Sequence, residues 1–151
     1  MNTIISEVGE LADEVEGVDF GDERLTKRLC RIVETLGVRP HDSIPAAAAT
    51  RAELEATYRF FANEKVTPEI ILSKHFECSV QRCSEQPLVL LIQDTTEVDL
   101  TRPTEQVAGA GPLDNDCRFG AFVHPLLAMS DGGIPLGFVW AGYRPKVAGT
   151  V

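Results

Sequence analysis

An aspartate that directly follows a short apolar run is the residue in this sequence best placed for metal chemistry. The run is Leu88–Ile92, the most apolar segment of the chain, and Gln93 and Asp94 come next. Aliphatic runs of this length are typical of a strand buried in the centre of a sheet. A carboxylate at the point where such a strand reaches the surface is a good ligand for a hard cation. We therefore take Asp94 as a candidate metal-binding residue.

A second group of candidate residues is basic. Arg24, Lys27, Arg28 and Arg31 lie within eight positions, opposite the apolar face of a predicted helix. Cations gathered on one exposed face can bind the phosphates of a nucleic acid. The alternative, which composition alone favours, is a solvated face whose cations pair with acids near the N-terminus.

The element that positions these cations is an amphipathic helix. Asp22 is a suitable N-cap, Gly37 suits the position just beyond the helix end, and Pro40 prevents further continuation. The apolar residues recur with the spacing of one buried helix face: Leu25, Leu29, Ile32, Val33 and Leu36.

Further helices are predicted on either side of it. Residues 4–16 carry an apolar stripe with an acidic opposite face, and residues 67–84 begin with a cap, a proline and an acid. Residues 51–62 form another helix, in which Tyr58 and Phe61 share one face and are interpreted as core.

After Pro87 the pattern changes from helices to strands. Residues 88–93 form the first predicted strand, and the turn-forming residues of 101–118 predict a loop. Residues 119–129 and 134–141 are strand-like and are joined by a Ser-Asp-Gly-Gly sequence typical of a hairpin. The sequence therefore predicts an α+β protein.

The net charge of −9 at first disfavours a nucleic-acid partner. However, residues 1–23 hold eight acids and no lysine or arginine, so the rest of the chain is close to neutral. No apolar stretch approaches the roughly 20 residues that span a bilayer, and the N-terminus lacks the features of a signal peptide. With its four cysteines read as reduced thiols, the protein is expected in the cytoplasm.

Several segments together resemble the Asp-Asp-Glu transposases of bacterial transposon five and its insertion-sequence-4 relatives. Any one segment is a weak signal, but their order and spacing over about residues 18–140 are specific. The matching segments are Gly21–Leu29, Ser43–Pro45, Tyr58–Asn63, Val66–Glu69, Gln93–Thr96, Gly109–Leu113, His124–Leu126 and Gly132–Gly137.

This resemblance implies two domains. Residues 1–86 would be a helical domain that binds double-stranded DNA at the transposon ends. Residues 87–151 would be an incomplete ribonuclease-H-like core that holds its first three strands. Asp94 would be the first catalytic carboxylate, at the end of the central strand. Since the second Asp and the Glu follow the hairpin in the family, we expect both to lie outside this chain.

The family chemistry depends on Mg²⁺. Three carboxylates hold two cations about 4 Å apart around the scissile phosphate, and Asp94 would supply one of them. Glu97 and Asp99 share one side of an extended chain while Asp94 points to the other, so they are not expected to complete the site. Neither are Asp114 and Asp116 in the following loop. The chain is thus expected to be inactive alone.

The resemblance also assigns roles to basic residues. The family uses cations near its Gly-Asp-x-Arg segment to contact DNA, which implies that role for Arg24, Lys27 and Arg28. Arg59, in the matching Tyr-Arg-Phe segment, is a further candidate. Arg31 is a candidate by its placement alone.

The sequence is also compatible with other functions. The chain could be a free-standing DNA-binding regulator that occupies transposon ends and lowers transposition by the full-length transposase. It could also be an unrelated soluble domain with a solvated basic face. A self-sufficient metal nuclease would need ligands that the sequence does not supply.

Overall fold

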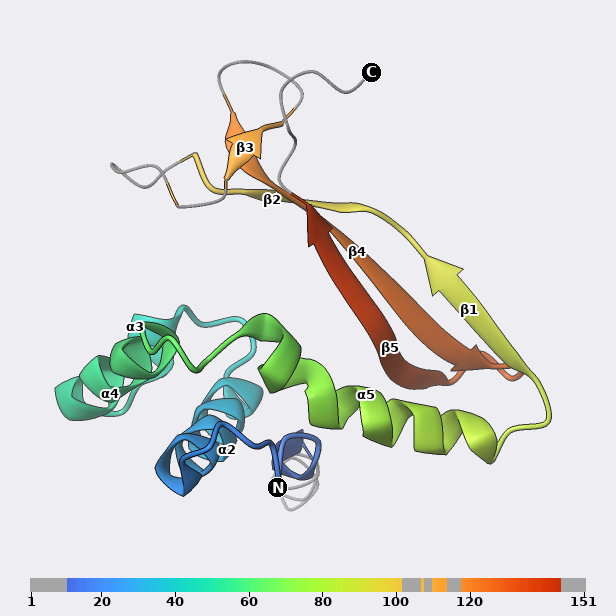
Figure 1. The fold of residues 1–151 in the computed structure, drawn as a ribbon, viewed down its shortest axis with the longest axis horizontal. Coiled ribbons are helices and arrows are strands. Elements are labelled where there is room, and N and C mark those ends of the chain that lie inside the picture. Colours follow the sequence, from blue (N-terminus) through green and yellow to red (C-terminus); the bar gives the residue numbers. More distant parts are fainter. Residues whose placement is uncertain (1–10, 102–106, 108–109, 114–117, 145–151) are drawn as a thin grey trace. The chain divides into compact units, whose positions relative to one another are not determined.

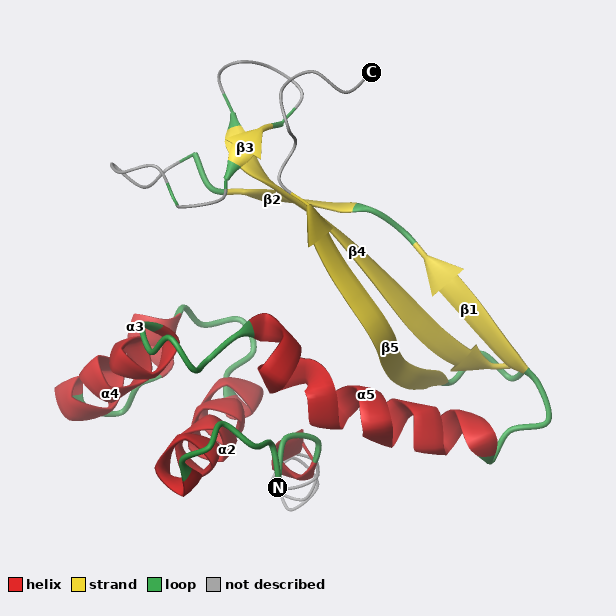
Figure 2. Cartoon of the chain, viewed as in Figure 1, coloured by secondary structure: helices red, strands yellow, loops and turns green. Residues whose placement is uncertain are grey.

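The computed structural model describes residues 11–101, 107, 110–113 and 118–144. The chain divides into two compact units, residues 1–78 and 79–151. The first unit is helical, and the second contains an antiparallel sheet (Figures 1 and 2). These elements confirm the predicted α+β class. The functional domains 1–86 and 87–151 stay a prediction.

The helices follow the order expected from the sequence. The predicted helix 4–16 is described only from residue 11, where residues 11–13 are helical. The helices that follow are α2 (Glu23–Val38), α3 (Ile44–Ala47), α4 (Arg51–Phe61) and α5 (Pro68–Ser84). The division between the two units falls within α5.

The start of α2 was predicted correctly and its end was not. Asp22 is the N-cap, and its side chain accepts the backbone N–H of Arg24 at 3.0 Å. Gly37, predicted to lie just beyond the end, is inside the helix, which continues to Val38. Arg39 then leaves the helical conformation, with φ −133° and ψ 61°. The residue before a proline is disfavoured in a helix, so Pro40 ends α2 in place of Gly37.

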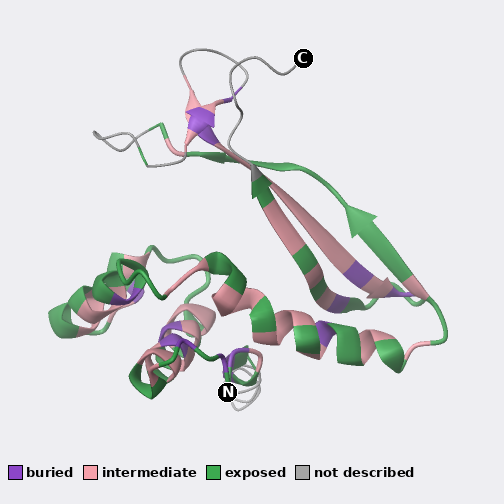
Figure 3. Cartoon of the chain, in the orientation of Figure 1, coloured by how far each residue is buried: buried purple, intermediate pink, exposed green. Residues whose placement is uncertain are grey.

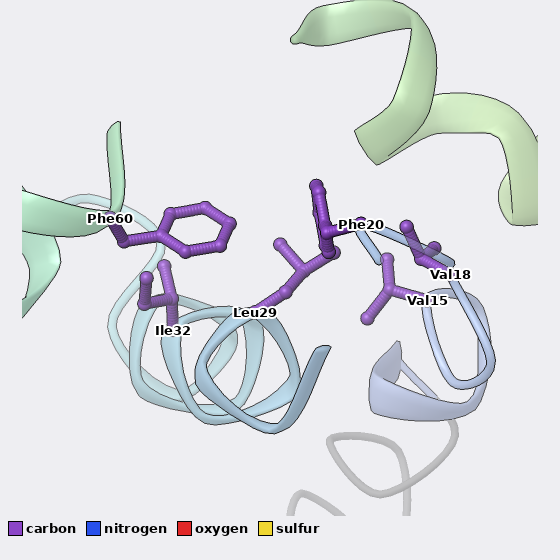
Figure 4. Close-up of a cluster of buried hydrophobic side chains, with 6 residues drawn as sticks. All are labelled: Val15, Val18, Phe20, Leu29, Ile32 and Phe60. Carbon is purple, nitrogen blue, oxygen red and sulfur yellow. The ribbon is translucent and has the colours of Figure 1, made fainter. Parts of the chain in front are cut away.

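The core of the helical unit forms where α2 meets α4 and the segment that precedes α2 (Figure 4). The rings of Phe20 and Phe60 meet edge to face, with centroids 5.7 Å apart. Burial of aliphatic and aromatic side chains between these segments is the main stabilising term of the unit. The buried cluster consists of Val15, Val18, Phe20, Leu29, Ile32 and Phe60.

The predicted core face of α4 was wrong. Phe60 is only 2% exposed, whereas Tyr58 and Phe61 are 49% and 46% exposed. The face that meets α2 carries Glu53, Thr57 and Phe60, which recur at helical spacing. Because two of these three residues are polar, the apolar pattern of the sequence indicated the neighbouring face instead.

The sheet of the second unit is built around one long strand. β4 (Phe119–Ser130) pairs antiparallel with β1 (Val89–Gln93) and β2 (Thr96–Asp99) along one edge. Along the other edge it pairs with β5 (Pro135–Arg144) and with the short β3 (Gly111–Pro112). The turn between β4 and β5 contains Gly133 with a positive φ of 80°, so the predicted hairpin is confirmed.

The apolar run that was expected to form a buried central strand lies instead at an edge. β4 occupies the centre because its 12 residues are long enough to pair with β1 and β2 in succession. Leu90, Leu91 and Ile92 of β1 are 48%, 58% and 45% exposed (Figure 3). An apolar composition indicates a strand but does not say which of its neighbours will pair with it.

We predict that Phe60→Ala destabilises the helical unit by about 3 to 5 kcal/mol, because it leaves a cavity between α2 and α4. The neighbouring change Phe61→Ala serves as the matched control and should cost less than about 1.5 kcal/mol, since that side chain is half exposed. Urea unfolding followed by far-ultraviolet circular dichroism measures both. Equal losses of unfolding free energy in the two variants would show that Phe60 is not the core residue of α4.

Candidate functional site

Helices α2 and α4 run antiparallel, and this decides which basic residues meet. At one end Arg31 of α2 forms an ion pair with Glu53 near the start of α4, with Nη2 and Oε1 2.6 Å apart. At the other end Arg24 and Arg28 of α2 lie across a groove from Arg59, near the end of α4. The packing thus gathers three of the five predicted DNA-binding residues.

The groove, which we call the arginine groove, lies between the start of α2 and the end of α4. Its volume is about 400 Å³. Three cationic side chains and one carboxylate line it together with apolar residues of both helices. The lining residues are Asp22, Arg24, Leu25, Arg28, Ala56, Arg59, Phe60 and Asn63.

The side chain of Arg24 is exposed, and its guanidinium donates two hydrogen bonds to the carboxylate of Asp22. Its Nε–H donates to Oδ1 of Asp22 at 3.1 Å, and its Nη2 donates to Oδ2 at 2.9 Å. The side chain of Arg24 is 90% exposed and that of Asp22 is 28% exposed. These hydrogen bonds lower the pKa of the Asp22 carboxyl to about 2 and raise the pKa of the Arg24 guanidinium.

Arg28 and Arg59 differ from Arg24 in their partners. Within the described part of the chain, no carboxylate pairs with either guanidinium. Arg59 donates its Nε–H to the backbone carbonyl of Glu55 at 3.3 Å. Both guanidinium groups therefore line the groove without a carboxylate partner among the described residues.

Lys27 and Arg31 lie in a different, acid-rich cleft. Lys27 pairs with Glu23 one turn earlier, with Nζ and Oε1 2.8 Å apart, and Arg31 pairs with Glu53. Each of these cations is paired with a carboxylate, and both line a cleft other than the arginine groove. The acid-rich cleft is lined by Glu16, Gly17, Glu23, Thr26, Lys27, Cys30, Arg31, Glu34, Thr35, Ala49 and Glu53.

Two polar residues of the groove were not identified as functional from the sequence. Asn63 follows Arg59 by four positions and lies beside it in the groove. Its Oδ1 accepts the backbone N–H of Lys65 at 3.0 Å. Asp22 was recognised only as a helix cap. The sequence signal that could have indicated Asn63 is its spacing of four positions from Arg59.

Asp94 lies at a break in the strand that borders β4. β1 and β2 pair with β4 in one continuous register, and the same register places Asp94 opposite Pro125 and Thr95 opposite His124. Proline has no backbone N–H, so β4 cannot donate a ladder hydrogen bond at this position. The break between β1 and β2 follows from Pro125.

The surroundings of Asp94 are polar and exposed. Its Oδ1 accepts the backbone N–H of Thr95 at 2.7 Å. The hydroxyl of Thr95 lies 2.9 Å from Nδ1 of His124 in a hydrogen bond. Asp94 thus stands at the end of β1, as the sequence predicted, and its catalytic and metal-binding role stays a prediction.

The acids that follow Asp94 most closely in the described ranges pair with an arginine. Arg118 pairs with Glu97 at 3.1 Å and with Asp99 at 3.8 Å. Asp114 and Asp116 lie outside the described residues. No group of three or more histidine, cysteine, aspartate or glutamate residues that could hold a metal ion occurs in the described ranges. The described residues therefore do not fit a two-cation Mg²⁺ site.

Comparison with protein families finds a match within the helical segment. Residues 10–66 match a family model described as transposase DNA-binding. The matched range contains α2, α3 and α4, both walls of the arginine groove and all five predicted DNA-binding residues. The match supports a DNA-binding role in transposition, and it ends before Asp94.

No helix among the described residues is both long enough and apolar enough to cross a membrane.

We predict a specific acid titration for Asp22. Its pKa is lowered from 3.8 to about 2 in the folded protein, chiefly by its hydrogen bond to Arg24. Its contribution to stability is therefore complete above the unfolded pKa of 3.8 and is lost as the pH falls through about 2. Carbon-detected NMR of the side-chain carboxyl should show this midpoint. The variant Arg24→Ala is the control and should move the midpoint up toward 3.8, and an ordinary midpoint in the unchanged protein would refute the Asp22–Arg24 pair.

Proposed function

We propose that this chain binds double-stranded DNA at transposon ends, as the N-terminal part of a cut-and-paste transposase similar to those of transposon five and the insertion-sequence-4 family. One observation carries the proposal. Three arginines from two helices converge on one groove, inside the segment that matches transposase DNA-binding domains. Arginine offers a fixed fork of donors that suits phosphate oxygens.

The distribution of charge supports this proposal despite the net charge of −9. Four glutamates line the acid-rich cleft, whereas a single carboxylate, that of Asp22, lines the arginine groove. Screening at physiological salt limits charge interactions across water to about 8 Å. A DNA backbone in the groove therefore experiences chiefly Arg28 and Arg59.

Cleavage is a separate matter from binding. In the proposed transposase, Asp94 is the first of three carboxylates that together hold Mg²⁺. No group of three or more possible metal ligands occurs among the described residues, and binding without cleavage is the activity proposed for this chain alone. A protein that occupies transposon ends without cutting them would also lower transposition by the full-length enzyme. Cytoplasmic localisation follows from a DNA partner as part of this proposal.

We predict that Arg24→Ala combined with Arg28→Ala weakens DNA binding at least about tenfold at ~0.1 M salt, because two of the three guanidinium groups that line the groove are lost. Mobility shifts with the terminal repeats of the source element measure this. Lys27→Ala combined with Arg31→Ala removes the same charge from the acid-rich cleft and should change affinity much less. Equal weakening by the two double variants would assign binding to net charge rather than to the groove.

We predict that the purified chain does not cut DNA in the presence of Mg²⁺, and that Asp94→Ala leaves its DNA affinity unchanged. Incubation with a duplex that carries the terminal repeats, followed by denaturing electrophoresis, tests the first point. Mg²⁺-dependent strand cleavage that disappears in Asp94→Ala would overturn the proposal of binding without catalysis.

A further inference from the structure

The arginine groove is lined by one acidic residue, Asp22, and this residue pairs with Arg24. We propose that Asp22 makes Arg24 a specificity-determining residue, by holding its guanidinium in one orientation and cancelling its charge. Arg28 and Arg59 would then supply the sequence-independent attraction to phosphates. This inference rests on the proposed DNA-binding function and assigns different tasks to residues of the same groove.

The geometry leaves a defined edge of Arg24 for a ligand. A guanidinium has five N–H donors, and Asp22 accepts one from Nε and one from Nη2. The remaining donors, on Nη1 and Nη2, form a second fork, and the side chain is 90% exposed. Such a fork can donate to O6 and N7 of a guanine, the commonest base-specific contact of arginine.

The orientation of this pair is fixed by the backbone. Asp22 caps α2 with the same Oδ1 that accepts from Nε of Arg24, because it also accepts the Arg24 backbone N–H at 3.0 Å. Two hydrogen bonds thus tie the guanidinium to the residue that caps the helix. A ligand must fit the direction of this fork, since the side chain cannot turn to follow a phosphate without breaking them.

The charge of the pair has a second effect. Sequence-independent binding grows with the number of phosphates that cations neutralise. With Asp22 present, Arg24 adds little to that number, and the carboxylate repels a misplaced phosphate. A carboxylate that repels a misplaced phosphate in this way raises specificity and lowers affinity.

The neighbouring residue Glu23 offers a matched control. It carries the same charge at the same helix end and pairs with Lys27, but it lines the acid-rich cleft. Asp22→Asn and Glu23→Gln each remove one negative charge. Asparagine caps a helix about as well as aspartate. Asp22→Asn therefore keeps the cap but removes the negative charge and the Oδ2 acceptor of the hydrogen bond from Nη2 of Arg24.

The experiment compares both variants as the full chain, with two duplex probes. The first probe is a mixed-sequence duplex, on which affinity is measured over a range of salt concentrations. Asp22→Asn should steepen the slope of log K against log salt by about 0.9, because Arg24 becomes an additional phosphate contact. Glu23→Gln should leave the slope unchanged. In an Arg24→Ala background, Asp22→Asn should have no effect on the slope.

The second probe is a duplex selected by the unchanged protein from a randomised library, compared with its scrambled sequence. Asp22→Asn should reduce the preference for the selected duplex about tenfold, as expected for loss of one base-reading contact. The inference is overturned if both variants behave alike, if Asp22→Asn changes neither slope nor preference, or if the unchanged protein binds DNA but selects no sequence. Absence of all DNA binding would instead contradict the proposed function.

Discussion

The placement of Phe60 against α2 is the contact on which the basic surface depends. It fixes how far α4 is displaced along α2, and the ion pair between Arg31 and Glu53 holds the same alignment at the other end. Arg59 stands next to Phe60 in sequence, so burial of the ring brings this arginine to the groove. A slip of one helical turn would move it about 5.4 Å away from Arg28. The packing of apolar side chains therefore determines which arginine side chains of the two helices come together.

The basic residues on the two sides of α2 have different surroundings. Lys27 and Arg31 face glutamates, while Arg28 faces the groove without a described carboxylate partner. An acidic protein can in this way present a local cationic surface, since salt screens the distant acids. Net charge bears on solubility and association rate, and the arrangement of individual pairs decides which surface meets DNA.

Local signals in the sequence were sufficient for the helix starts and the hairpin, since a cap such as Asp22 and a turn such as 130–133 act on neighbouring residues. Features set by distant partners were not predictable in this way. The burial of Phe60 in place of Tyr58 depends on which face α2 covers. The edge position of β1 depends on the length of β4, and the pairing of Arg31 depends on Glu53, which lies far away in sequence. The arginine groove is a tertiary feature.

The most direct test of the account is to observe the arginine side chains of the full chain by NMR while a mixed-sequence duplex is added at low salt. The Nε–Hε resonances of Arg28 and Arg59 should shift first and furthest, with that of Arg24 following. The resonance of Arg31 should stay in place, since its guanidinium is held by Glu53. Large shifts at Arg31 without shifts at Arg28 and Arg59 would contradict the assignment of DNA binding to the arginine groove.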